Sequence, residues 1–204
     1  MAVCYIVGAG DCPPLDSIVI NEGDTVIAAD AGLRYLREAG IEPDSVIGDF
    51  DSLGKVPEGG SVTVLPTEKD VTDMYAAAEA GIAAGFTRFK FYGWSGGRLG
   101  HTIANIQLCA SLAERGYRAD FVTDKQVMTA LSGGEMRFDK SHTGYISVFS
   151  FTDECRGVTL EGLKYPLAEA TLSSRFPLGV SNEFTGVDSL VKVRQGTLIV
   201  VFGA

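Results

Sequence analysis

Acidic residues directly follow two short apolar runs in the first half of the chain. Asp30 follows Val26–Ala29, and Asp49 and Asp51 follow Val46–Gly48. Alternate residues of an extended backbone point to the same side, so Asp49 and Asp51 face one way. A Mg²⁺ ion with oxygen ligands relieves the repulsion between two such carboxylates. An Asx turn after a strand explains the same residues without a metal, and the residue types alone leave both interpretations open.

A second acidic pair, Asp70 and Asp73, stands where the helix-period segment Val71–Ala84 begins. Side chains one helical turn apart share a face, which would aim both carboxylates at one ligand. Thr67 and Asp70 also have the spacing of a capping box, and acidic residues favour the first turn of a helix. Capping and catalysis both explain Asp70.

The glycine-rich segment Gly93–Arg98 joins an apolar run to a helical segment that carries His101 and Asn105. Backbone amides at a strand-to-helix junction bind phosphate, and the arginine can grip it with two N–H donors. His101 and Asn105 lie one helical turn apart, so they share a face near the helix start. Capping, or burial in the core, is the alternative for His101.

Another glycine pair, in Gly8-Ala9-Gly10, follows the first apolar run. It lacks the third glycine of a dinucleotide fingerprint, and no clear helix follows it. We therefore reject dinucleotide binding at this position.

The sequence pattern changes near residue 125, and the pattern before this point predicts an α/β domain over residues 1–125. Short apolar runs alternate there with helix-period segments, which indicates a mostly parallel sheet with helices on its faces. The predicted strands are Val3–Val7, Thr25–Ala29, Ser45–Gly48, Ser61–Leu65, Phe89–Tyr92 and Ala119–Val122. The predicted helices are Gly32–Ala39, Val71–Ala84 and Thr102–Arg115.

The pattern after residue 125 predicts an all-β domain over residues 126–204. The helical period disappears, and short strands are punctuated by Gly, Pro, Asn and Asp, as in an antiparallel sandwich or barrel. The predicted strands are Gln126–Leu131, Glu135–Phe138, Tyr145–Phe151, Gly157–Leu160, Glu169–Leu172, Ser189–Val193 and Thr197–Phe202.

Composition argues against several classes of protein. The formal net charge is −9 and the lysines and arginines form no cluster, so we expect no nucleic-acid partner. No apolar run approaches the roughly 20 residues of a membrane span, and no signal segment begins the chain. We therefore expect a cytoplasmic protein without a membrane partner. The cysteines form no C-x-x-C pair, which favours reduced thiols in or near a core. They are Cys4, Cys12, Cys109 and Cys155.

Six motifs occur in a consistent order along nearly the whole chain. They are Ala29-Asp30-Ala31-Gly32, Gly48-Asp49-Phe50-Asp51-Ser52, Lys69-Asp70-Val71-Thr72-Asp73, Gly96-Gly97-Arg98-Leu99-Gly100-His101 with Asn105, Gly162-Leu163-Lys164-Tyr165-Pro166-Leu167 and Ser181-Asn182-Glu183. Together they resemble the thiamine pyrophosphokinase family. The resemblance implies an enzyme that transfers the pyrophosphoryl group of ATP to the hydroxyl of thiamine. It also implies a homodimer, with thiamine bound between the α/β domain of one chain and the β domain of its partner.

The resemblance assigns roles in the α/β domain to residues that the spacing alone left open. Asp49, Asp51 and Asp73 are expected to hold Mg²⁺, and Asp70 to hold a second metal ion or accept the hydroxyl proton. Arg98 is expected to bind the phosphates of ATP. Further residues are expected to line the nucleotide side of the pocket: Asp30, His101 and Asn105.

In the β domain the resemblance implies a thiamine site. Tyr165 is expected to supply an aromatic face for the vitamin, and Ser181 and Asn182 short polar groups from a turn between strands. One position departs from the family pattern, because Gly100 stands where the family has an aspartate. A pyrophosphokinase for another alcohol, such as a hydroxymethyl pterin, and a non-catalytic nucleotide or thiamine sensor are the alternatives.

Overall fold

The computed structural model describes residues 1–16, 18–50, 61–66 and 70–203. The chain divides into two compact units. One consists of Met1–Leu108 with Ala119–Asp124, and the other of Cys109–Arg118 with Lys125–Ala204. The first is α/β with parallel strands and the second is antiparallel β, which confirms the predicted fold class.

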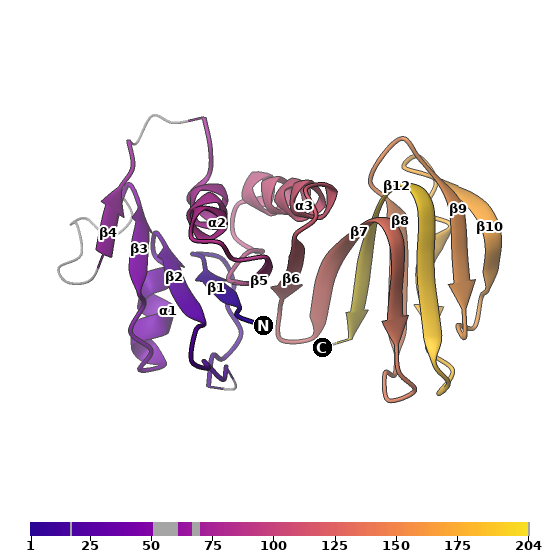
Figure 1. The fold of residues 1–204 in the computed structure, drawn as a ribbon, viewed down its shortest axis with the longest axis horizontal. Helices are drawn as coiled ribbons and strands as arrows, with labels where there is room; N and C mark the ends of the chain where they lie inside the picture. The colour runs from indigo at the N-terminus through magenta and orange to yellow at the C-terminus, as the bar shows by residue number, and fades with distance from the viewer. Residues whose placement is uncertain (17, 51–60, 67–69, 204) are drawn as a thin grey trace. The chain divides into compact units, whose positions relative to one another are not determined.

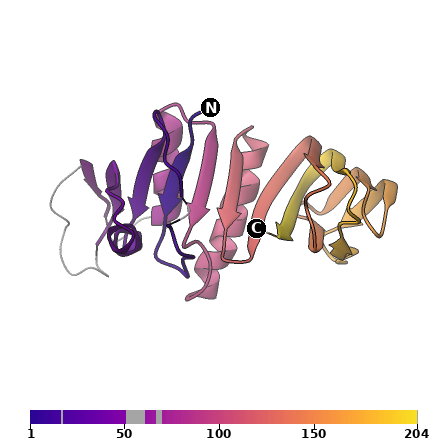
Figure 2. The same cartoon turned by 90° about the horizontal axis from the view of Figure 1, so that it is seen from below.

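The first unit is built on a sheet whose strands run in the order β6-β5-β1-β2-β3-β4 (Figure 1). The strands are β1 (Cys4–Val7), β2 (Thr25–Ala29), β3 (Ser45–Gly48), β4 (Ser61–Val64), β5 (Arg88–Tyr92) and β6 (Arg118–Val122). The neighbours from β5 to β4 all pair in parallel. Figure 2 shows the strands of this sheet side by side, from indigo to magenta. Because β1 lies between β2 and β5, the order of the strands reverses at β1.

Helices cover both faces of this sheet. Leu33 and Leu36 of α1 (Gly32–Glu38) belong to one core cluster with Tyr5 of β1. Cys4, the neighbour of Tyr5, faces α2 (Asp73–Ala83): a Cβ added at Gly81 would lie 2.8 Å from the Cys4 Sγ. Successive residues of a strand face opposite sides, so α1 and α2 lie on opposite faces of the sheet.

The ends of α2 follow from local side chains and one glycine. Thr72 has an extended backbone, and its hydroxyl oxygen accepts a hydrogen bond from Tyr75 N at 3.2 Å, which caps the helix start. At the other end Gly85 has a φ of 91°, a conformation that side chains disfavour. Phe86 N donates to Gly81 O at 3.1 Å and closes the last turn.

The second unit consists of antiparallel strands that share a long strand, β12. The strands are β7 (Gln126–Phe138), β8 (Tyr145–Ser150), β9 (Glu154–Glu161), β10 (Leu167–Ser173), β11 (Gly179–Glu183) and β12 (Ser189–Gly203). β12 pairs with β7 along its length, with β9 through its first half and with β8 through its second half. β10 pairs with β9, and β11 with β8. The buried core includes Ile146, Val158, Val191 and Leu198.

Three predictions in this unit were wrong in detail, each at a backbone irregularity. β7 is one strand where two were expected, and it contains Gly133 and Gly134 at positive φ. β12 is likewise one strand, with a register shift between Val193 and Thr197. The glycines that mark these irregularities resemble turn signals in the sequence, although a bulged strand uses them as well. β11 was not predicted at all.

The four cysteines are free thiols in the structure. Burial raises the pKa of Cys4 to about 12 and that of Cys12 to about 11, so both thiols stay protonated at neutral pH. A protonated thiol is a poor nucleophile, so these two residues are unsuited to covalent catalysis. Among the helices that the structure describes, none has the length and apolar character needed to span a bilayer.

Candidate active site

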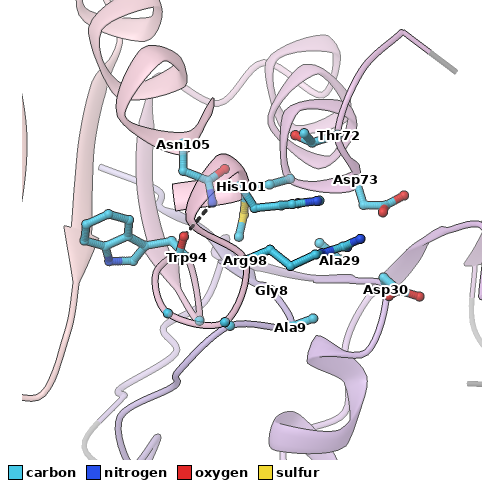
Figure 3. Close-up of a pocket in the computed structure, with 15 residues that line it drawn as sticks. Gly8, Ala9, Ala29, Asp30, Thr72, Asp73, Trp94, Arg98, His101 and Asn105 are labelled. Carbon is cyan, nitrogen blue, oxygen red and sulfur yellow. Dashed lines mark hydrogen bonds between the residues drawn. The ribbon is translucent and has the colours of Figure 1, made fainter. Parts of the chain in front are cut away.

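A pocket of about 240 Å³ lies at the carboxyl ends of β1, β2 and β5. Its lining comes from residues 8–10 after β1, Asp30 after β2, residues 72–74 where α2 begins, the turn after β5, and the first turns of α3 (Leu99–Glu114). Figure 3 shows these side chains converging on the pocket. Open α/β sheets bind ligands at the carboxyl ends of the strands where the strand order reverses, which here is at β1.

Direct backbone contacts between two glycine-containing loops form one wall of the pocket. Gly8 N donates to Tyr92 O and Gly10 N to Gly93 O, both at 2.8 Å. A Cβ added at Gly10 would lie 2.3 Å from Ser95 O, and one added at Gly93 would lie 2.3 Å from Gly8 O. Only glycine permits this approach, so the two loops fix each other through their main chains.

The glycine-rich turn (Gly93–Arg98) is anchored further through its tryptophan. Asn105 of α3 is buried, and its side-chain amide donates to Trp94 O at 2.6 Å (Figure 3). The Trp94 indole donates to Val122 O at 3.1 Å and meets Phe121 edge to face at 5.6 Å. Asn105 therefore lies in the predicted pocket, and its side-chain amide bonds the turn.

Basic and acidic side chains line the same pocket. Arg98 and His101 are exposed, and Figure 3 shows Arg98 extending across the pocket toward the side of Asp30 and Asp73. A guanidinium beside backbone amides suits a phosphate chain, and carboxylates suit a divalent cation. The exposure of His101 argues against the core alternative that the sequence left open, whereas the capping alternative is untested.

Two strands of this sheet are followed, at their carboxyl ends, by a non-glycine residue in the left-handed backbone conformation. Asp30 after β2 has a φ of 49°, and Phe50 after β3 has a φ of 59° although it is not glycine. Phe50 is 2% exposed and packs in the core, and Asp30 N donates to Ile47 O at 2.8 Å. Left-handed backbone at non-glycine residues persists only where packing enforces it, and it clusters at functional sites.

The remaining acidic residues of the prediction have different positions. Asp49 is described at the end of β3, beside β2, and is half-buried, but it is not part of the pocket lining. Asp51 lies outside the described residues. Asp70 is exposed and precedes α2.

The start of α2 corrects one expectation about Asp70. The helix begins at Asp73 and not at Val71, because Thr72 has an extended backbone and caps it. Asp70 and Asp73 therefore do not share a helical face. Thr67, the other half of the expected capping box, lies outside the described residues. In the described ranges, no three His, Cys, Asp or Glu side chains gather as a ligand set.

The predicted thiamine residues meet in the second unit. The side-chain amide of Asn182 bonds the backbone of Tyr165 in both directions, by Tyr165 N to Oδ1 at 2.9 Å and by Nδ2 to Tyr165 O at 2.8 Å. We refer to this pair of bonds as the Tyr165 clamp. Tyr165 is 58% exposed, whereas Asn182 is 3% exposed. Ser181 and Asn182 lie in β11 and not in a turn. The strand is bulged, and Ser181 within the bulge has a φ of 56°.

Sequence reasoning missed several parts of the pocket. Gly8, Ala9 and Gly10 were set aside with the dinucleotide fingerprint, and Met74 and Thr72 were given no place in a site. A signal was present for the glycines, because they directly follow the first strand and therefore lie at the ligand-binding edge of a parallel sheet. Met74 is an ordinary buried helix residue in sequence, and nothing marks its neighbours in space.

Comparisons with known proteins agree along the length of the chain. The family model "Thiamin pyrophosphokinase, catalytic domain" matches residues 17–120, and "Thiamin pyrophosphokinase, vitamin B1 binding domain" matches residues 135–198. A thiamine pyrophosphokinase of Bacillus subtilis (strain 168) is 28% identical over 182 residues, which cover 86% of this chain and 85% of that protein.

Solved structures give the same result. The crystal structure of thiamine pyrophosphokinase from Bacillus subtilis is similar with a TM-score of 0.89 and 26% identity, covering 100% of this chain and 99% of that chain. The structure from Geobacillus thermodenitrificans has a TM-score of 0.84 and 27% identity, covering 100% and 98%. The chain therefore belongs to the thiamin pyrophosphokinase family, with a catalytic domain followed by a vitamin B1-binding domain.

Proposed function

We propose that this enzyme transfers the pyrophosphoryl group of ATP to the hydroxyl of thiamine, giving thiamine diphosphate and AMP. One observation carries the proposal: a glycine-rich turn, Arg98 and the carboxylates of Asp30 and Asp73 line one pocket at the switch point of a parallel sheet. Such a pocket offers N–H donors to a phosphate chain and oxygen ligands to a cation.

The reaction breaks one phosphorus–oxygen bond and forms another. The thiamine hydroxyl oxygen attacks the β-phosphorus, the bond from that phosphorus to the bridging oxygen breaks, and the oxygen leaves with AMP. The hydroxyl proton passes to a base. Transfer of this kind depends on in-line positioning and charge stabilisation more than on covalent catalysis. Arg98 binds the phosphates, and Asp30, His101 and Asn105 shape the nucleotide side of the pocket.

The donor set suits Mg²⁺, which we propose as the cofactor. Mg²⁺ is usually held by one or two carboxylates together with substrate phosphates, so a cluster of three protein ligands is not required. One or two of the candidates Asp49, Asp51 and Asp73 would hold the ion, and of these Asp73 lines the pocket. Asp70 would hold a second ion or accept the hydroxyl proton. Bound there, Mg²⁺ would supply positive charge to neutralise the phosphate oxygens.

We place thiamine against Tyr165, which is exposed and whose backbone bonds the side chain of Asn182. Thiamine has a cationic thiazolium ring and a flat aminopyrimidine, and an aromatic face can bind both by stacking and by cation–π attraction. We also propose a homodimer in which the vitamin site of one chain serves the ATP pocket of its partner. Mixed dimers of an Asp49→Asn chain and a Tyr165→Ala chain would then recover part of the activity, and dimers without recovery would contradict this arrangement.

A coupled assay for AMP release tests the function directly. The full chain with ATP and Mg²⁺ should release AMP when thiamine is added, and thiamine diphosphate should form in equal amount. Release with a hydroxymethyl pterin and not with thiamine would identify a different pyrophosphokinase. Binding of ATP and thiamine without AMP release would identify a sensor. Omission of Mg²⁺ should abolish the release.

A further inference from the structure

The segment that presents Tyr165 runs antiparallel to the end of β11. Leu163 pairs with Phe184 in an isolated bridge, and Lys164 N donates to Glu183 O at 3.0 Å. One residue further along, the backbone of Tyr165 bonds the side chain of Asn182. The amide of Asn182 thus takes the place that a strand backbone has in a regular ladder.

The amide oxygen of Asn182 is already fully used. It accepts from Tyr165 N and also from Glu183 N, both at 2.9 Å, and an amide oxygen has two lone pairs. Asn182 is 3% exposed, whereas Tyr165 is 58% exposed. The accessible group at this position is therefore the tyrosine, and the asparagine lies behind it.

The backbone of β11 explains why Asn182 points inward. The register between β11 and β8 shifts between Gly179 and Asn182, and Ser181 within the shift has a φ of 56°. Ser181 N is held by Ser147 Oγ at 3.0 Å. A bulge of this kind re-aims the following side chain, here into the protein.

A second link in the same place is weaker. Lys164 Nζ bonds Glu183 Oε1 at 2.8 Å and lies 5.5 Å from the centroid of the Tyr165 ring. The bond to Glu183 raises the pKa of Lys164, so the ammonium group persists through the neutral range. Both side chains are exposed, and exposed ion pairs contribute little to fixed geometry. The clamp is the contact that fixes the backbone of Tyr165.

We propose that Asn182 is a positioning residue of the vitamin site, which orients Tyr165 through the clamp and does not itself bind thiamine. This inference rests on the proposed function, because it assumes that Tyr165 stacks on the vitamin. In this arrangement the side-chain amide of Asn182 supports the aromatic ring of Tyr165 and makes no contact with the vitamin. The affinity for thiamine then depends on Asn182 only while the tyrosine ring is present.

A double-mutant cycle on the full-length protein separates this role from direct binding. Tyr165→Ala and Asn182→Ala should each raise the KM for thiamine, by about tenfold and about fivefold, with the KM for ATP almost unchanged. The double variant should match Tyr165→Ala alone. If the two effects multiply, Asn182 acts independently of the ring, and the inference is overturned.

Hydrogen exchange of the Tyr165 backbone amide, measured without any ligand, tests the clamp itself. Asn182→Ala should speed this exchange by about tenfold or more, because the amide loses its acceptor. The isosteric Asn182→Asp retains an acceptor for Tyr165 N, so the amide should stay protected while the KM for thiamine rises less. Unchanged exchange in Asn182→Ala, or fast exchange with an unchanged KM, would overturn the proposal.

A matched control is Thr185→Ala, which removes the hydrogen bond from Thr185 Oγ1 to Gly162 O at 2.8 Å and does not touch Tyr165. It should leave the KM for thiamine and the Tyr165 exchange rate unchanged. If Asn182→Ala speeds the exchange as expected but the unmodified protein releases no AMP with thiamine, the proposed function is refuted and the structural role of the clamp is retained. The two failures are therefore distinguishable.

Discussion

The two regions of this chain hold their candidate sites by different means. The pocket of the α/β region is fixed by main-chain contacts between loops, in which Gly10 and Gly93 leave no room for a Cβ. In the β region an exposed tyrosine is held by the side chain of Asn182. A backbone-held site fixes phosphate groups whose geometry the reaction requires, whereas a side-chain-held site needs only to present a binding face. We therefore expect changes in the first region to affect turnover or folding, and changes in the second to affect affinity.

The largest effect is expected at the carboxylates of the α/β region. Asp73→Asn and Asp49→Asn should each lower kcat about a thousandfold, or about 4 kcal/mol of barrier, because each removes a proposed Mg²⁺ ligand. Stability should change by less than about 1 kcal/mol, the size of a helix-terminus charge effect. Steady-state kinetics and urea unfolding measure both quantities. Near-normal kcat in either variant would remove that residue from the metal site.

The next effect tests the backbone-held wall. Gly10→Ala places a Cβ 2.3 Å from Ser95 O and 2.8 Å from Gly93 O, and neither main-chain atom can move alone. We expect a loss of about 3 kcal/mol of unfolding free energy together with loss of ATP binding. Gly100→Ala is the matched control, since nothing lies within 4 Å of its added Cβ. Equal stability of the two variants would show that the wall is not constrained in this way.

The sequence predicted the parts of the fold and site that depend on local order. Strands that alternate with helices indicate a parallel sheet, and an acidic residue after a strand must lie at its carboxyl edge. This is why Asp30, at the end of β2, was found in the pocket. Asp73 was found for a related reason, because it begins a helix at the same edge.

The parts that were missed depend on partners distant in sequence or on backbone irregularity. Nothing in the sequence indicated that the side-chain amides of Asn105 and Asn182 bond the backbones of Trp94 and Tyr165, which are distant in the chain. β11 could not be recognised because Ser181 leaves the extended conformation inside it. Local residue types do not report which main-chain atoms a distant segment will offer.

A smaller effect is expected where the α/β region also uses a side chain. Asn105→Ala removes the donor to Trp94 O, and an unsatisfied buried carbonyl costs about 1–3 kcal/mol. The KM for ATP should rise because the glycine-rich turn loosens, while the KM for thiamine should not. Gln107→Ala, at an exposed position of the same helix, is the control. An increased KM for thiamine alone would contradict the separation between the regions.

The smallest effect is expected at Gly100, where the family has an aspartate. The position is exposed in the first turn of α3, and an added Cβ meets nothing within 4 Å, so a side chain can be accommodated. Gly100→Asp should stabilise the protein by about 0.5–1 kcal/mol, because it replaces a glycine and adds a negative charge near a helix N-terminus. Asp30 already lines the pocket, whereas Asp70 does not, and we expect Asp30 to supply the carboxylate that position 100 lacks.

The rate of Gly100→Asp should therefore change by less than tenfold, which corresponds to about 1.4 kcal/mol of barrier. Gly100→Ala separates the two contributions, since it gains the helix propensity without the charge. Kinetics at several Mg²⁺ concentrations, with both variants compared to the unmodified chain, measure the difference. A tenfold or greater gain in kcat for the aspartate over the alanine would mean that the site lacks a carboxylate. The backbone-held pocket would then have preserved its geometry while one catalytic charge was lost.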